Sequence, residues 1–189
     1  MEENFTRDEH LEQVNYTREV LKREYENCHF QTCNLSNVNL SGIVFLECSF
    51  GDCNFSSAEL KNTAFRDCSF TSCKMIGLRF EECDPFLLSF SFKNCDLSYT
   101  SFFQLKIPKT SFKKCKMEQV EFTGANCSGA DFSEADLLGS SFGNTNLEKA
   151  DFRSACNFSI DPEQSHMANA KFSQEDLSGL LTKYKLKVY

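Results

Sequence analysis

Large apolar side chains recur at every fifth position over most of this 189-residue chain. One series of such positions runs from Tyr25 to Phe80 and a second from Phe92 to Phe152, with a shift of two positions between them, and neither contains a polar residue. A period of five matches neither the 3.6-residue turn of an α-helix nor the two-residue alternation of a strand. The chain must therefore turn once in every pentad if these side chains share one core.

A smaller residue stands two positions before most of the large ones. Cys48, Ala58 and Val120 are examples, and the remaining three positions of each pentad are mostly polar. Each pentad therefore directs two side chains inward and three outward, which describes one side of a coil. Four such sides make a coil of twenty residues, the interval at which the segments CHFQTC, CSFGDC and CSFTSC recur. Self-similarity at such a period predicts a solenoid.

The eleven cysteines follow this period, and nine of them occupy the small inward position. Stacked coils repeat at about 4.8 Å, whereas the Cβ atoms of a relaxed disulfide are about 3.8 Å apart. The C-x4-C spacing places neighbouring cysteines on different sides of the coil, which does not suit a tetrahedral zinc site. We interpret the cysteines as small buried apolar residues, with metal binding or redox chemistry as the alternative. One column would hold Cys33, Cys53, Cys73, Cys95 and Cys115.

The repeat is clearest in six consecutive pentads at residues 125–154, which read ANCSG ADFSE ADLLG SSFGN TNLEK ADFRS. Most of them have a small residue at the first position, Asp or Asn at the second, and Leu or Phe at the third, followed by residues that are mostly polar or glycine. On this pattern the chain resembles the pentapeptide-repeat family over about residues 20–158. The resemblance implies an all-β fold, a right-handed quadrilateral β-helix whose large and small columns stack inside.

Three segments are expected along the chain. Residues 1–19 are a polar N-terminal segment, residues 20–158 are the β-helix with a two-residue register slip at 81–91, and residues 159–189 are a C-terminal cap and dimerisation segment. Ser173 and Asp176 have the spacing of a helix capping box, and apolar residues follow at helical spacing. A short C-terminal capping α-helix is therefore expected, because the last coil of a solenoid must be covered.

The C-terminal end has a second expected role. In the gyrase-binding members of the family the corresponding end forms a twofold dimer, so the resemblance implies a homodimer here. Capping alone is the alternative. The residues expected at this end are Leu177, Leu180, Leu181, Tyr184, Leu186 and Val188.

Charge is distributed unevenly along the chain. Residues 61–117 hold ten Lys and Arg against five Asp and Glu, and residues 118–161 hold two against eight. If two chains join at their C-terminal ends, the acidic segments form an acidic cylinder that repels nucleic acid and favours a basic groove. The alternative is that these residues serve solubility. The outward acidic residues are Glu118, Glu121, Asp131, Glu134, Asp136, Glu148 and Asp151.

Within the family, the chain is similar to the Qnr-like and microcin-immunity members in its length, its cysteine-rich early coils and its expected C-terminal helix. Those members imply a DNA mimic that binds DNA gyrase or topoisomerase IV, protects it from quinolones or peptide toxins, and does not bind nucleic acid directly. The long loops that matter for protection in some relatives are missing. The slip in EECDPFLLSFSF, residues 81–92, is either a binding bulge at Asp84, Pro85 and Phe86 or an accommodation of Phe90, and we favour the latter.

Other classes of function are not expected. The three histidines, His10, His29 and His166, stand in no motif with a nucleophile and a base, and no Gly-rich phosphate loop occurs. We therefore expect no enzyme, no cofactor and no metal. With neither an export signal nor a membrane-spanning apolar run, we expect a cytoplasmic protein away from membranes. The alternative function is an interaction scaffold of the same fold with a partner other than a topoisomerase.

Overall fold

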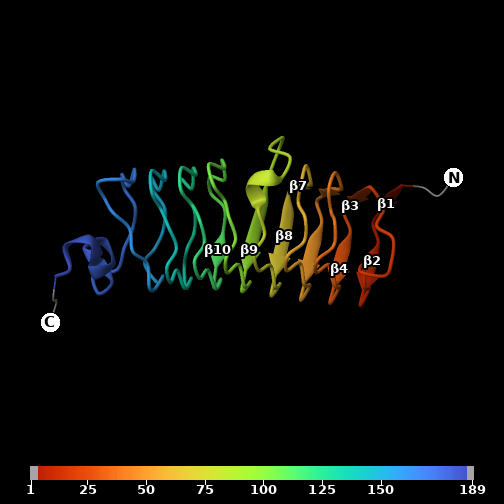
Figure 1. The fold of residues 1–189 in the computed structure, drawn as a ribbon, viewed down its shortest axis with the longest axis horizontal. Helices are drawn as coiled ribbons and strands as arrows, with labels where there is room; N and C mark the ends of the chain where they lie inside the picture. Colours follow the sequence, from red (N-terminus) through yellow and green to blue (C-terminus); the bar gives the residue numbers. More distant parts are fainter. Residues whose placement is uncertain (1–3, 187–189) are drawn as a thin grey trace.

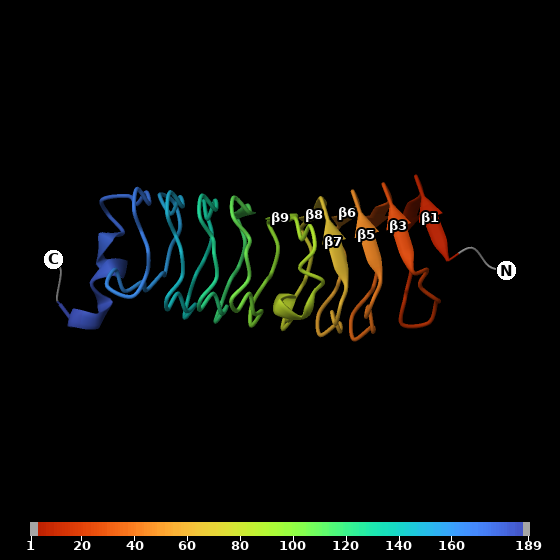
Figure 2. The ribbon, with the colours of Figure 1, turned by 90° about the horizontal axis from the view of Figure 1, so that it is seen from above.

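The chain winds into stacked coils that form one elongated rod, seen from two sides in Figure 1 and Figure 2. The computed structural model describes residues 4–186. Both sheets pair their strands in parallel, and most pairing partners are twenty residues apart, as in Phe30 and Phe50. Within residues 4–186 there is no helix with the length and apolar character needed to cross a membrane.

Four ladders of parallel pairing define four faces of the rod, which we name A to D. Face A contains β1 (Phe5–Arg7), β3 (Glu24–Glu26), β5 (Val44–Leu46) and β7 (Ala64–Arg66). Face B contains β2 (His10–Glu12), β4 (His29–Gln31), β6 (Ser49–Gly51), β8 (Cys68–Thr71), β9 (Phe90–Lys93) and β10 (Phe112–Lys113). Isolated bridges form face C, from Asn15 to Cys156, and face D, from Asn39 to Ser141. The quadrilateral coil expected from the pentads is confirmed.

Stacked aromatic rings run through the core parallel to the rod axis. On face B, the rings of Phe30 and Phe50 have centroids 4.7 Å apart, and those of Phe132 and Phe152 are 4.6 Å apart. Rings of adjacent faces meet edge to face, as in Phe45 and Phe50 at 5.3 Å. Such aromatic pairs each contribute about 0.5–1.5 kcal/mol beyond the burial of their surface. The face B column consists of Phe30, Phe50, Phe70, Phe92, Phe112, Phe132, Phe152 and Phe172.

The small inward position does more than leave room for the large residue. Its side chain donates to the backbone carbonyl of a large residue in the preceding coil: Cys53 Sγ lies 3.5 Å from Phe30 O, and Thr145 Oγ1 lies 2.8 Å from Phe122 O. A buried carbonyl without a partner is costly, so a short donor at this position stabilises the stack. This preference accounts for cysteine, serine and threonine at equivalent places. All eleven cysteines are free thiols, ten of them buried.

The two extra residues of the register slip do not enter the coil, and the chain forms a protruding loop there. The pairing interval grows from twenty to twenty-two residues where Cys68 pairs with Phe90, and the chain between them leaves face A after η1 (Phe80–Glu82), a 3-10 helix. Phe90 occupies a small inward position and is buried, with its ring centroid 5.0 Å from that of Phe92. The core therefore accommodates the Phe90 ring, and the chain projects as a loop at residues 83–89 in the same coil.

The coils extend further at both ends than the sequence pattern indicates. β1 and β2 lie within the expected polar segment 1–19 and pair with β3 and β4, so the expected start at residue 20 is wrong. Their partners are nineteen residues away, as for Thr6 and Tyr25, and polar Thr6 interrupts the apolar series. At the other end, Asp151 still pairs with Lys171, beyond the expected limit at residue 158.

The expected C-terminal α-helix is wrong. Two 3-10 helices, η2 (Leu177–Leu180) and η3 (Thr182–Tyr184), occupy its place, and Ser173 donates to the Asp176 carboxylate rather than capping a helix. The carbonyl of Gly179 accepts the N–H of Ile160 at 3.0 Å, a group that an α-helix would use internally. A Cβ added at Gly179 would lie 2.5 Å from the Phe158 ring, so the segment packs directly onto the last coil.

We predict that thiol labelling of the native protein modifies Cys156 rapidly and the ten buried cysteines slowly. The thiolate is the reactive form, and burial raises the pKa of Cys48 to about 12 and also raises the pKa of Cys127. The measurement is a time course with Ellman's reagent under native and denaturing conditions. Cys156→Ser serves as the control and should remove the fast phase; several fast thiols in that variant would contradict the buried columns.

Candidate functional site

The predicted acidic residues encircle the rod rather than forming one patch. Each is exposed or half-buried. Asp131 and Asp151 lie on face B, Asp136 on face C and Glu121 on face D, while the others occupy corners between faces. We call the seven together the acidic belt: Glu118, Glu121, Asp131, Glu134, Asp136, Glu148 and Asp151.

The aspartates of the acidic belt also have a structural role. Asp131 Oδ1 accepts the backbone N–H of Ser133 at 2.8 Å, and Asp151 Oδ1 accepts that of Arg153 at 3.2 Å, closing the turn at the corner. Asn126 closes the equivalent turn with its amide oxygen at 3.0 Å. The turn therefore requires a side-chain oxygen two residues before the N–H, and an amide supplies it as well as a carboxylate. The negative charge is additional to what the fold requires.

Basic neighbours neutralise part of the acidic belt. Glu134 pairs with Lys114 at 3.2 Å and Glu118 with Lys116 at 3.5 Å. A hydrogen bond from Arg153 lowers the pKa of Asp151, and one from Lys149 lowers the pKa of Glu148. Within residues 4–186, no Lys, Arg or His nitrogen lies within 4.0 Å of the carboxylates of Glu121, Asp131 and Asp136. Those three therefore carry the uncompensated charge.

The loop at residues 83–89 presents an apolar projection, the apolar knob, formed by Phe86 and Leu87. Their exposed fractions are 64% and 66%. Arg66 holds the loop from its base: its guanidinium donates to Asp84 Oδ2 at 3.3 Å and to Phe86 O at 3.4 Å, and lies 5.3 Å from the Phe86 ring centroid. Asp84 in turn accepts the Phe86 N–H at 3.0 Å.

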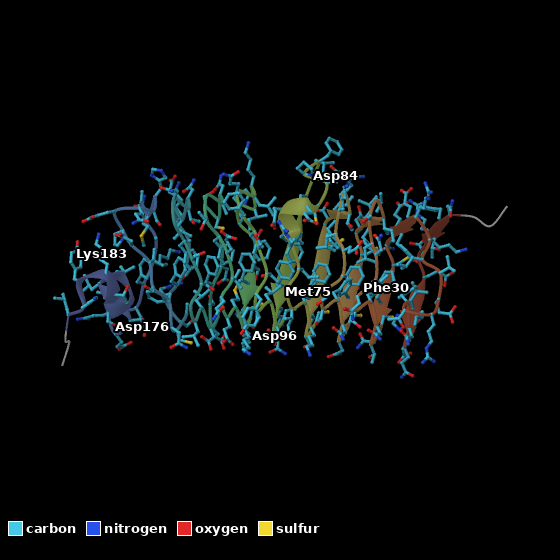
Figure 3. The ribbon with its side chains drawn as sticks, in the orientation of Figure 1. Phe30, Met75, Asp84, Asp96, Asp176 and Lys183 are labelled. Atoms are coloured by element: carbon cyan, nitrogen blue, oxygen red, sulfur yellow. The ribbon has the colours of Figure 1, made fainter. Side chains whose placement is uncertain are left out.

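Sequence reasoning named Asp84, Pro85 and Phe86 but missed Arg66 and Leu87. The sequence pattern gives no signal for Leu87. Its backbone is left-handed, with φ of 56°, a conformation that is unfavourable for leucine and that the apolar period does not reveal. Figure 3 places Asp84 and Asp96 on opposite sides of the rod, so the knob lies away from face C.

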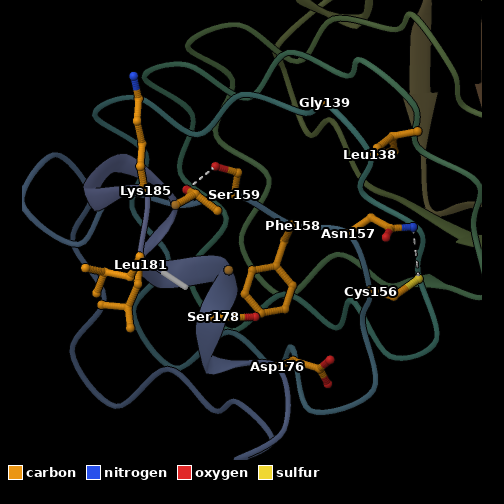
Figure 4. A pocket seen from close by; sticks show the side chains of 13 residues that line it. Leu138, Gly139, Cys156, Asn157, Phe158, Ser159, Asp176, Ser178, Leu181 and Lys185 are labelled. Carbon is orange, nitrogen blue, oxygen red and sulfur yellow. Dashed lines mark hydrogen bonds between the residues drawn. The ribbon is translucent and has the colours of Figure 1, made fainter. Parts of the chain in front are cut away.

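The C-terminal segment is fastened to the last coil and leaves apolar side chains outside. Lys183 Nζ lies 2.7 Å from both Asp161 Oδ1 and Glu163 Oε2, and Ser159 hydrogen-bonds Thr182 at 2.6 Å. An open cavity of about 700 Å³ is lined by residues of both the segment and the last coil, with Phe158 on its wall (Figure 4).

The residues expected at this end take different positions. Leu180 packs against the core, as a cap requires. Val188 lies outside the described residues. The other four are exposed, at fractions of 38–60%: Leu177, Leu181, Tyr184 and Leu186.

The histidines form no evident catalytic arrangement. His29 Nδ1 lies 2.6 Å from Ser49 Oγ on open face B, a Ser–His contact that sequence reasoning missed. Within residues 4–186 no carboxylate is hydrogen-bonded to His29, so the third group that orients the imidazole in a Ser–His–Asp triad is missing there. His166 bridges Asn146 on face A. Among the same residues, no three His, Cys, Asp or Glu side chains are placed to hold a metal ion.

Comparisons with known proteins agree with this geometry. The solved structure of a trypsin-treated variant of QnrB1, described as a plasmid-mediated fluoroquinolone resistance protein, matches with a TM-score of 0.65 and 19% sequence identity, covering 98% of this chain and 100% of that one. Full-length QnrB1 matches with a TM-score of 0.59 and 18% identity, covering 96% of this chain and 100% of that chain. No curated protein sequence matches the chain. The profile of the pentapeptide repeat region matches residues 24–102 and 79–152, and the chain therefore belongs to the pentapeptide-repeat family.

Proposed function

We propose that this protein is a DNA mimic that binds the DNA-binding surface of a type II topoisomerase, DNA gyrase or topoisomerase IV, and counteracts quinolones or peptide toxins there. The observation that carries the proposal is the acidic belt, in which Glu121, Asp131 and Asp136 have no basic partner among residues 4–186. The negative charges repeat around the rod at a coil spacing of about 4.8 Å. Like a DNA duplex, the rod therefore presents regularly spaced negative charge to a basic groove. The similarity in fold to QnrB1 supports the choice of partner.

We further propose that the active form is a homodimer joined at the C-terminal ends. Leu177, Leu181 and Tyr184 expose apolar surface there, at the end nearest the acidic belt. Joining two such ends in a twofold contact buries the apolar surface and brings the two acidic belts together. The resulting rod is about twice as long, with its negative charge at the centre.

We assign the apolar knob to protection, through a contact of its own with the enzyme. A loop held by Arg66 and Asp84 loses little conformational entropy when it docks, which favours affinity per contact. Large apolar side chains that enter a pocket are typical hot spots of interfaces. The acidic belt would therefore hold the protein on the enzyme, and Phe86 and Leu87 would act on the enzyme next to the belt.

We predict that the triple variant Asp131→Asn, Asp136→Asn, Asp151→Asn weakens inhibition of gyrase supercoiling by about tenfold or more, because it removes charge and keeps the oxygen that closes each turn. The measurement is a supercoiling assay with and without a fluoroquinolone. The matched control is the triple variant of Asp52, Asp67 and Asp96 to Asn, which removes the same charge from other coils and should retain inhibition. An equal loss of inhibition in both variants would show that the net charge of the protein matters and the position of the acidic belt does not. Full inhibition by the first variant would refute the proposal.

We predict that Phe86→Ser with Leu87→Asn raises the protein concentration needed to relieve drug-induced DNA cleavage by about tenfold, with a smaller effect on supercoiling inhibition. Asparagine tolerates the left-handed backbone at position 87, so the loop should keep its shape. A variant with Tyr99→Ser and Phe103→Ser, which removes two other exposed rings, is the control. If both pairs behave alike, the knob has no specific role.

A further inference from the structure

Five lysines gather along the edge between faces B and C, in the coils that precede the acidic belt. Lys93 pairs directly with Lys113 in the register of β9 and β10. On face C, Lys74 and Lys116 both pair with Asp96, from opposite sides. We call this group the lysine ridge: Lys74, Lys93, Lys113, Lys114 and Lys116.

The lysine ridge holds positive charge that the structure does not compensate. Lys114 and Lys116 have carboxylate partners, but among residues 4–186 no carboxylate oxygen lies within 4.0 Å of the ammonium groups of Lys74, Lys93 or Lys113. Like charges directly opposite each other on neighbouring strands are destabilising, and Lys93 and Lys113 are such a pair.

The fold does not require lysine at these corners. Thr71 pairs with Lys93 one coil earlier, and Ser133 supplies the same corner one coil after Lys113. The stacked lysines therefore lower the stability of the coils, although the fold would accept uncharged residues at these positions. A ligand that supplies negative charge would remove this cost.

Hydroxyl donors lie beside the ridge. Ser69, Ser91 and Ser111 follow one another along face B and are half-buried; Ser91 stands two positions before Lys93, and Ser111 two positions before Lys113. Ammonium and hydroxyl groups together form a donor surface for oxygen anions, at the spacing of the coils. The ligand is therefore an array of carboxylates or phosphates.

The charges around the ridge favour carboxylates on a protein. Asp52 lies in the coil before it, and Asp131 and Glu134 in the coils after it, so the ridge is short and has acidic residues at both ends. A nucleic-acid duplex carries a negative charge about every 1.7 Å and would continue onto these acidic residues. A compact acidic patch on a folded protein ends where the ridge ends.

We propose that the lysine ridge binds a carboxylate-rich patch of the protein that receives the acidic belt, and so fixes the position of the rod along its partner. This inference rests on the proposed function, since it assumes that the acidic belt docks in a basic groove. In the twofold dimer proposed above, one lysine ridge lies on each side of the joined acidic belts. A shift of the rod along its partner would bring the lysines against the basic groove, and this repulsion of like charges disfavours other positions.

The test compares two triple variants with the same change of charge. In the ridge variant Lys74, Lys93 and Lys113 become Glu; in the control Lys61, Lys106 and Lys109, away from the B–C edge, become Glu. We expect the ridge variant to weaken binding to purified gyrase about tenfold at 0.1 M salt, with the control within about threefold of the unmodified protein. Equal effects of the two variants would overturn the proposal.

A probe without gyrase separates this inference from the proposed function. A fluorescein-labelled octaglutamate peptide should bind the protein at low salt by fluorescence anisotropy, bind the control variant equally, and not bind the ridge variant. Failure of the peptide to bind overturns the ridge as a carboxylate site whatever gyrase does. A DNA duplex that binds more tightly than the peptide would assign the ridge to nucleic acid and overturn the proposal as well. If the peptide binds as expected and the unmodified protein does not bind gyrase, the proposed function fails and the assignment of gyrase as the ridge's partner fails with it.

Discussion

The structure depends on the stacking of each inward side chain on its equivalent in the next coil. Parallel pairing at intervals of twenty residues places Phe50 over Phe30 and under Phe70, with ring centroids 4.7 and 4.8 Å apart. The hydrogen bonds between coils and the contacts between rings repeat with the same spacing, so they strengthen the same arrangement. A change in the length of one coil therefore disturbs every column at once, and a change in an outward residue disturbs none. Function in such a molecule is confined to outward positions, corners and ends.

This division explains how much the sequence can reveal. The large and small columns, the four-sided coil and the buried cysteines follow from the period alone, because a core that repeats must repeat in the sequence. The first coil was missed because it is one residue shorter, with Thr6 under Tyr25, so the five-residue series fails there although the pairing continues. The C-terminal helix was wrongly predicted because the leucines have helical spacing, while the bond from Ile160 to Gly179 and the tight contact with Phe158 depend on the last coil. Helical propensity is a weak preference that such contacts override.

The candidate surfaces were predictable only in part, for a related reason. The acidic residues could be placed outward, but the sequence could not tell which of them have basic partners, since Lys114 and Glu134 are neighbours only through the coil. The same holds for the lysine ridge. Lys93 and Lys113 are twenty positions apart, and their repulsion arises because two corners coincide in successive coils. Charge counted along the chain locates zones on the rod axis, whereas the face on which each zone lies requires the register of every coil.

The protruding loop is the consequence of the stacking constraint where the interval grows from twenty to twenty-two residues. Two extra residues between Cys68 and Phe90 cannot enter a coil without moving every column, so the chain leaves the stack at a corner and returns in register for β9. The core volume at that corner is taken up by Phe90, in a position where other coils have cysteine, threonine or alanine. The loop outside the stack needs contacts of its own. Arg66, in the preceding coil, provides them through its hydrogen bonds to Asp84 and Phe86 and its contact with the Phe86 ring. Packing and binding are therefore compatible explanations of the slip. The same two extra residues allow Phe90 to enter the core and place Phe86 and Leu87 outside it.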